Sequence, residues 1–194
     1  MKKGRLEAFS DGVIAVIITI MVLELHAPHE ASLSAVLEEA HPFFAYVLSF
    51  VYVAIYWNNH HHMFQAVEHV NGQVLWANNL LLFTLSLVPF ATNWMGETDF
   101  ALVPTIVYGA VMLLPGVGYF VLARALVRLH GPDSTLARAM GRGVKEWASL
   151  VLYALGIAGA FIHPYVAFVF YIAVAAMWFV PDRRIERQLD RSAG

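Results

Sequence analysis

The sequence predicts an all-α integral membrane protein, because it is rich in apolar residues and contains six apolar stretches of membrane-spanning length. Of its 194 residues, 59% are hydrophobic and only 13% are charged, with a mean hydropathy of +0.62. A soluble domain would carry about 25% charged residues. The sequence shows no internal repeat and no change of composition that would mark a second domain. We therefore expect a single six-helix transmembrane domain over residues 1–194.

Each apolar stretch has roughly the 17 to 25 residues that a helix needs to cross the hydrocarbon core. Proline stands near the start of three of them, where a missing N–H does little harm. Pro89 and Pro115 fall inside spans and are expected to kink them unless neighbouring groups satisfy the freed carbonyls. The predicted spans are Phe9–Leu25, Pro42–Trp57, Leu75–Trp94, Ala101–Leu122, Trp147–Ile162 and Tyr165–Val180.

Lysine and arginine gather in three regions that six spans would place on one side of the membrane. These regions are the N-terminus, the link between the fourth and fifth spans, and the C-terminal tail. By the positive-inside rule, both termini are expected to be cytoplasmic in a multi-pass protein of the cell inner membrane. The link should hold a short helix over Ser134–Met140, and the tail over 181–188 should be a solvated anchor or a short surface helix. Membrane lipids are therefore expected partners, whereas no basic, aromatic-interleaved pattern indicates nucleic acid.

The first span carries an apolar stripe. Val16, Ile20 and Leu23 recur at i, i+4 and i+7, and Thr19 lies beside them. In a symmetric oligomer the stripe would form stacked apolar rings, which gate by dewetting and pass ions that shed water readily, potassium more easily than sodium. Ordinary helix packing would produce the same periodicity.

Glu24 follows this stripe at the outer end of the first span. If the span lines a pore, Glu24 would concentrate cations at the outer mouth; otherwise its side chain extends to the membrane interface. An alternative function uses Asp11, Glu24 and histidines as the relay of a proton-coupled cation or metal transporter. A haem-binding membrane protein with axial histidines is a second alternative.

Polar side chains cluster at the inner ends of the first three spans. Buried polar groups in lipid need partners, so we expect one histidine to bond Ser10 or Asp11. At least one asparagine of the third span should bond this group or the histidines. The expected network, a structural one, comprises Arg5, Ser10, Asp11, His60, His61, Asn78 and Asn79.

The sequence argues against a metal site or an enzyme. The histidines at positions 60–62 are consecutive, and consecutive helical residues point about 100° apart, so they cannot jointly hold one ion. There is no cysteine, which excludes disulfides, iron-sulfur clusters and thiol catalysis. No nucleotide-binding loop, zinc-protease motif or nucleophile elbow occurs. We therefore expect no cofactor and no catalytic residue.

Three motifs resemble the prokaryotic branch of the transmembrane protein 175 family, whose animal member is the endolysosomal potassium channel. They are Arg5-x-x-x-Phe9-Ser10-Asp11-Gly12-Val13 with Thr19, Trp57-x-x-His60-His61-x-x-Phe64, and Asn79 through Leu87-x-Pro89-Phe90-x-Thr92. The specific match covers the first three spans, while the last three agree only in hydropathy and length.

The resemblance implies a homotetramer whose first helix lines a central pore without a T-V-G-Y-G filter, with potassium as the permeant ion. It assigns Val16 to the narrowest ring, Thr19 to a pore-facing position, and Ile20 and Leu23 to the turns beyond. Family members carry isoleucine or leucine at the first of these positions. The smaller valine implies a wider, less selective ring or a tight point moved to Ile20 or Leu23. The polar network would hold the first helix in place.

Overall fold

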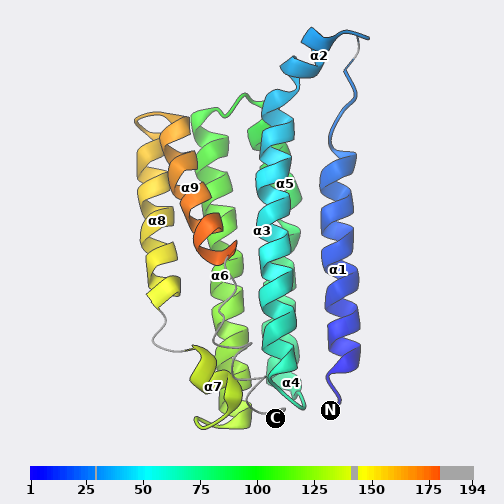
Figure 1. The fold of residues 1–194 in the computed structure, drawn as a ribbon, viewed down its shortest axis with the longest axis vertical. Coiled ribbons are helices and arrows are strands. Elements are labelled where there is room, and N and C mark those ends of the chain that lie inside the picture. The colour runs from blue at the N-terminus through cyan, green and yellow to red at the C-terminus, as the bar shows by residue number, and fades with distance from the viewer. Residues whose placement is uncertain (29, 141–143, 180–194) are drawn as a thin grey trace.

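The computed structural model describes residues 1–28, 30–140 and 144–179. Its long helices stand side by side with their axes roughly parallel (Figure 1). In chain order the helices are α1 (Gly4–Leu23), α2 (Leu33–Glu38), α3 (Ala40–Gln65), α4 (Gly72–Ser86), α5 (Val88–Glu97), α6 (Leu102–His130), α7 (Thr135–Met140), α8 (Val144–Ala160) and α9 (Pro164–Phe179).

Four segments among the described residues are long and apolar enough to cross a membrane. They are α1, α3, the α4–α5 pair and α6. The expected interruption at Pro89 is present, because α4 ends at Ser86 and α5 begins at Val88. Pro115, by contrast, lies inside α6, a helix of 29 residues that is not interrupted there. The fifth and sixth predicted spans correspond to α8 and α9, which have only 17 and 16 residues.

Several helices extend beyond the predicted spans because hydropathy detects only the part that matches hydrocarbon. α1 begins at Gly4 and so includes the polar N-terminal motif, and α3 continues to Gln65 through the histidine run. α6 ends at His130, where Gly131 adopts a φ of 90° that favours glycine. The predicted cytoplasmic helix is α7, and the predicted tail structure lies outside the described residues.

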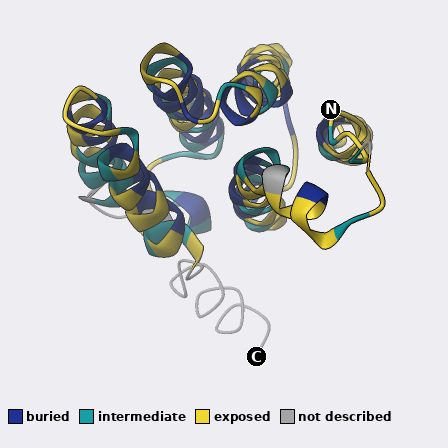
Figure 2. Cartoon of the chain, turned by 90° about the horizontal axis from the view of Figure 1, so that it is seen from above, coloured by how far each residue is buried: buried dark blue, intermediate teal, exposed yellow. Residues whose placement is uncertain are grey.

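The helices form a bundle with α1 at one edge and the α8–α9 hairpin beside α6 at the other (Figures 1 and 2). α4 packs on α6, α3 packs on α5, and α1 leans on α3, α4 and α5. Viewed from above, α1 touches the bundle on one side only (Figure 2). This placement leaves the outer side of α1 without a partner among the described residues of the single chain.

Hydroxyl groups join the central helices inside the bundle. Thr92 on α5 donates to Ser49 on α3 over 2.7 Å, and the Ser49 hydroxyl lies 3.1 Å from that of Tyr108 on α6. Tyr52 on α3 donates to the carbonyl of Tyr171 on α9 over 2.6 Å. Since unpaired polar groups are costly in a membrane interior, these bonds fix how α3, α5, α6 and α9 meet.

The glycine pairs Gly116/Gly118 and Gly156/Gly159 suggest close packing between helices, and the structure shows such contacts at all of these positions except Gly116. A Cβ on Gly118 would lie 2.8 Å from the Cα of Leu81 on α4, and one on Gly156 would lie 2.6 Å from the ring of Tyr171. Gly116 differs from the expectation, because its Cβ would meet only the Tyr56 hydroxyl at 3.5 Å. Gly118 therefore sets the spacing of α4 and α6, and Gly116 faces open space.

Gly118→Ala should lower the free energy of unfolding by about 1–3 kcal/mol, because the new methyl must displace the α4 backbone. Gly116→Ala in the same helix is the matched control and should be neutral or stabilising by up to about 1 kcal/mol through helix propensity. Thermal unfolding of both purified variants in detergent measures the difference. Equal destabilisation by the two would contradict the close contact.

Candidate pore-lining helix and its polar anchor

α1 has two distinct faces. The buried face carries four apolar residues and one serine, at spacings of three and four residues that bring them onto one side of the helix. These residues are Leu6, Ser10, Ile14, Ile17 and Met21. They pack toward α3, α4 and α5. The hydrophobic contact accounts for the attachment of α1 to the bundle.

The opposite face of α1 carries the apolar stripe. Val16 is 55% exposed, Ile20 41% and Leu23 78%, although all three are large aliphatic residues. Thr19 is also exposed, and its hydroxyl donates to the Val16 carbonyl over 2.9 Å. A continuous apolar face without a partner indicates contact with lipid or with another chain.

A chain of buried hydrogen bonds ties the other face to the neighbouring helices. His60 on α3 lies 2.9 Å from the Oδ1 of Asn78 on α4, and the Asn78 amide donates to Ser10 over 2.9 Å. Ser10 in turn donates to the carbonyl of Leu6 over 2.9 Å. All three side chains are buried. The chain thus links three helices and ends on the backbone of α1.

The directions of these bonds follow from what each group can donate. The Leu6 carbonyl can only accept, so Ser10 uses its hydroxyl hydrogen there and must accept from the Asn78 NH₂. That orientation turns the Asn78 oxygen toward His60, whose Nε2 must therefore carry a proton. We assign His60 the Nε2–H tautomer on this network.

A second contact, at the protein surface beside Ser10, attaches α1 to α3. The indole of Trp57 donates to Asp11 over 2.9 Å, and it stacks on His61 with ring centroids 5.7 Å apart. His61 is also within 2.8 Å of the Gln65 amide nitrogen. Asp11 thus bonds an indole rather than a histidine. These contacts hold the solvent side of α1 against α3.

The residues before α1 are attached to the end of α3 and the loop that follows it. The Lys3 ammonium donates to the Phe64 carbonyl and pairs with Glu7 at 3.7 Å. The backbones of Met1 and Val70 exchange two hydrogen bonds of 2.9 and 3.0 Å. The start of α1 is therefore fixed in position along the bundle.

We call the hydrogen-bonded set of Ser10, Asn78 and His60 the anchor of α1. The structure does not bring every expected residue into it. Arg5 and Asn79 are exposed, and no hydrogen bond or ion pair of either side chain is found within residues 1–28, 30–140 and 144–179. Arg5 precedes Val16 by about three helical turns and so shares its exposed face. Glu24 is exposed at the C-cap of α1, beyond the stripe. Within the described chain, no group of three or more His, Asp or Glu side chains could hold a metal ion.

Comparisons with known proteins identify the family of this chain. A model of the family described as "Endosomal/lysosomal potassium channel TMEM175" matches residues 5–89. A potassium channel of Chryseobacterium sp. (strain P1-3) is 50% identical over 189 residues, covering 97% of this chain and 98% of its own. The chain belongs to the TMEM175 family.

Two further TMEM175-family comparisons extend the match along the chain. A potassium channel of Streptomyces collinus (strain DSM 40733 / Tue 365) is 34% identical over 151 residues, 71% of this chain and 73% of its own. The crystal structure of a lysosomal potassium-selective channel TMEM175 homolog from Chamaesiphon minutus matches with a TM-score of 0.79 and 28% identity. It covers 93% of this chain and 97% of that one. The similarity of fold therefore extends to α8 and α9, beyond the sequence motifs, which end at Thr92.

Sequence reasoning missed Trp57 as the partner of Asp11. Its position three residues before His60 was a usable signal, because residues three apart lie on neighbouring parts of one helix face. Hydropathy alone places Trp57 only at the end of an apolar span. An indole N–H at a membrane boundary needs an acceptor, and the nearby carboxylate supplies it.

Asn78→Ala should destabilise this TMEM175-family protein by about 1–3 kcal/mol, because it leaves both His60 and Ser10 without their partners. Asn79→Ala changes the exposed neighbour and should have little effect. Thermal unfolding of the two variants, followed by loss of the folded size-exclusion peak, makes the comparison. A neutral Asn78→Ala would show that the buried chain does not hold α1.

Proposed function

We propose that this protein is a potassium channel in which four copies of α1 surround a central pore. The observation that carries the proposal is the exposed apolar face of Val16, Ile20 and Leu23, opposite a hydrogen-bonded anchor. The names of its relatives support the permeant ion, since those of Chryseobacterium and Streptomyces are called potassium channels. The chain's main partners would be its own copies and the surrounding lipids.

The three exposed residues would form a hydrophobic constriction. At about 1.5 Å of rise per residue, the rings of Val16, Ile20 and Leu23 span about 10 Å along the pore axis. Such a passage excludes an ion unless the ion can lose part of its hydration shell. That loss costs potassium less than sodium. We therefore propose a potassium-selective or weakly selective cation channel that works without a carbonyl filter. Thr19 would offer a polar group between the rings.

The anchor would determine which residues face the pore. A rotation of α1 by one residue, about 100°, would replace the stripe by its neighbours. The bond between Ser10 and Asn78 opposes that rotation at the level of the membrane boundary. The fixed contacts of Lys3 and Met1 oppose sliding along the axis.

We further propose six spans per subunit, with α8 and α9 as the fifth and sixth, in the inner membrane. Both are apolar and near the lower limit of spanning length. The start of α1 and the end of α6 lie at the same end of the bundle (Figure 1). Lys2 and Lys3 precede α1, and Arg124 and Arg128 stand in the last two turns of α6. The positive-inside rule places that end, and both termini, in the cytoplasm.

A proton-coupled transporter is less well supported. Asp11 and Glu24 are separated by about 20 Å along α1, too far for direct proton transfer. Asp11 already accepts from Trp57, and His60 is bonded to Asn78. Our proposal needs no chemical step and no cofactor, because potassium is only the permeant ion.

Val16→Asn and Ile20→Asn should each reduce the preference for potassium over sodium, because a hydrated ring no longer requires the ion to shed water. Cation flux into proteoliposomes under opposed potassium and sodium gradients measures the ratio. Val169→Asn on α9 is the matched control, since this valine is 65% exposed but lies on a helix remote from α1. An unchanged potassium-to-sodium ratio in both α1 variants would show that α1 does not line the pore.

Glu24→Gln should lower single-channel conductance at low ionic strength and have little effect at about 1 M salt, where the Debye length is about 3 Å. A ring of carboxylates concentrates cations only where it is unscreened. Bilayer recordings at two salt concentrations separate the cases, with Glu30→Gln as a control in the following loop. A salt-independent change would assign Glu24 a structural role.

A further inference from the structure

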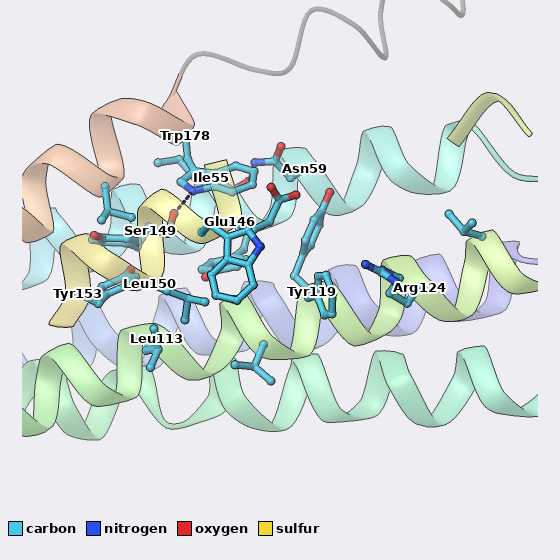
Figure 3. Close-up of a pocket in the computed structure, with 18 of the residues that line it drawn as sticks. Ile55, Asn59, Leu113, Tyr119, Arg124, Glu146, Ser149, Leu150, Tyr153 and Trp178 are labelled. Carbon is cyan, nitrogen blue, oxygen red and sulfur yellow. Dashed lines mark hydrogen bonds between the residues drawn. The ribbon is translucent and has the colours of Figure 1, made fainter. Parts of the chain in front are cut away.

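A cavity of about 560 Å³ lies between α3, α6, α8 and α9, away from α1 (Figure 3). Its volume falls within the range of sites that hold a small molecule. Most of the wall is apolar, and it includes Leu113, Val117 and Leu150. Gly116 enlarges it, because the position where a Cβ would stand is open apart from the Tyr56 hydroxyl.

The cavity runs from the membrane boundary into the hydrocarbon level. Arg124, at one end, lies about 33 Å along α6 from its first residue, close to the full thickness of about 30 Å of the apolar core. Leu113, at the other end, lies about 16 Å deeper on the same helix. A molecule that fills the space must therefore be polar at one end and apolar along the rest.

The cavity wall carries one cation and one anion. Arg124 lies at one end, and Glu146 lies between Arg124 and Leu113 (Figure 3). Arg124 places its guanidinium 4.7 Å over the Phe120 ring, and Glu146 projects into the same space from the start of α8 (Figure 3). Among the residues that the structure describes, neither takes part in an ion pair. Burying either charge beside an apolar occupant would be costly without a partner.

The wall also contains a buried hydroxyl. Tyr153 is 3% exposed and lines the cavity, and its hydroxyl makes no hydrogen bond of normal geometry within the described chain, although the Tyr52 hydroxyl lies near enough to interact with it. The neighbouring phenol of Tyr52 donates to the Tyr171 carbonyl instead. By comparison, Trp178 in the same wall is held by a 2.8 Å bond to Ser149. The Tyr153 hydroxyl is therefore available to bond an acceptor on an occupant.

We propose that this cavity is a binding site for an aminophospholipid of the leaflet on the side where α1 begins. Its phosphate would bind Arg124, its primary ammonium would donate to Glu146, and one acyl chain would lie along Leu113 and Val117. An ester carbonyl is the acceptor that such a lipid brings toward Tyr153. The inference requires membrane insertion but not ion conduction.

The pair of opposite charges selects this class among bilayer lipids. Phosphatidylglycerol would satisfy Arg124 but place no cation beside Glu146. A choline headgroup is zwitterionic, yet its quaternary nitrogen has no N–H to donate to the carboxylate. Ethanolamine provides both the charge and the N–H donors, and charge-assisted hydrogen bonds are the stronger kind.

Native mass spectrometry of the purified full chain tests the proposal. The protein is incubated with equimolar dioleoyl phosphatidylethanolamine, phosphatidylglycerol and phosphatidylcholine, and bound lipid is counted per chain. Wild type should favour phosphatidylethanolamine by about tenfold, the factor that one charge-assisted hydrogen bond contributes. Glu146→Gln should abolish this preference while retaining binding, and Arg124→Gln should weaken all three lipids.

Two further variants keep the test decisive. Gly116→Leu fills the open wall and should reduce binding of every lipid. Arg128→Gln removes an exposed arginine one turn from Arg124 that does not line the cavity, and should change nothing. Each variant must keep the wild-type size-exclusion profile. Equal binding of the three lipids by wild type, or equal losses in Arg124→Gln and Arg128→Gln, would overturn the proposal.

Discussion

The rotation of α1 is the constraint on which the proposed pore depends. Apolar contacts of Ile14, Ile17 and Met21 hold the helix to the bundle, but hydrophobic attraction is not directional and would tolerate a twist. The bond from Asn78 to Ser10 is directional and buried. In lipid its loss would leave two polar groups without water to replace it. One short polar chain therefore decides which face of α1 is left outside.

That polar chain is only as fixed as the helices that carry it. His60 stands on α3 and Asn78 on α4, so their relative position must be set elsewhere. Gly118 brings α6 against the α4 backbone, and Ser49 and Thr92 join α3 to α5 within the bundle. The frame of α3 to α6 is thus assembled by small residues and hydroxyls, and α1 is added to it.

The sequence was sufficient for the apolar helices and for the group of polar residues that could form an anchor, because hydropathy and buried polarity both follow from transfer free energy. It could not say which polar residue meets which. Asn79 has the same side chain as the bonded Asn78, and Arg5 carries a positive charge like the bonded Lys3, yet helix phase leaves Asn79 and Arg5 exposed. Gly116 and Gly118 differ only in the side of α6 on which they lie. Which side faces α4 depends on the tertiary packing of α6.

α3 separates the proposed pore helix from the lipid cavity and contacts both. Asn59 lines the cavity while His60, the next residue, begins the anchor of α1. Successive helical residues point about 100° apart, so a single rigid helix can serve two sites without either touching the other. An occupant that shifts α3 would shift His60 as well. Coupling between the sites would be reciprocal, so the position of α1 would in turn alter lipid affinity.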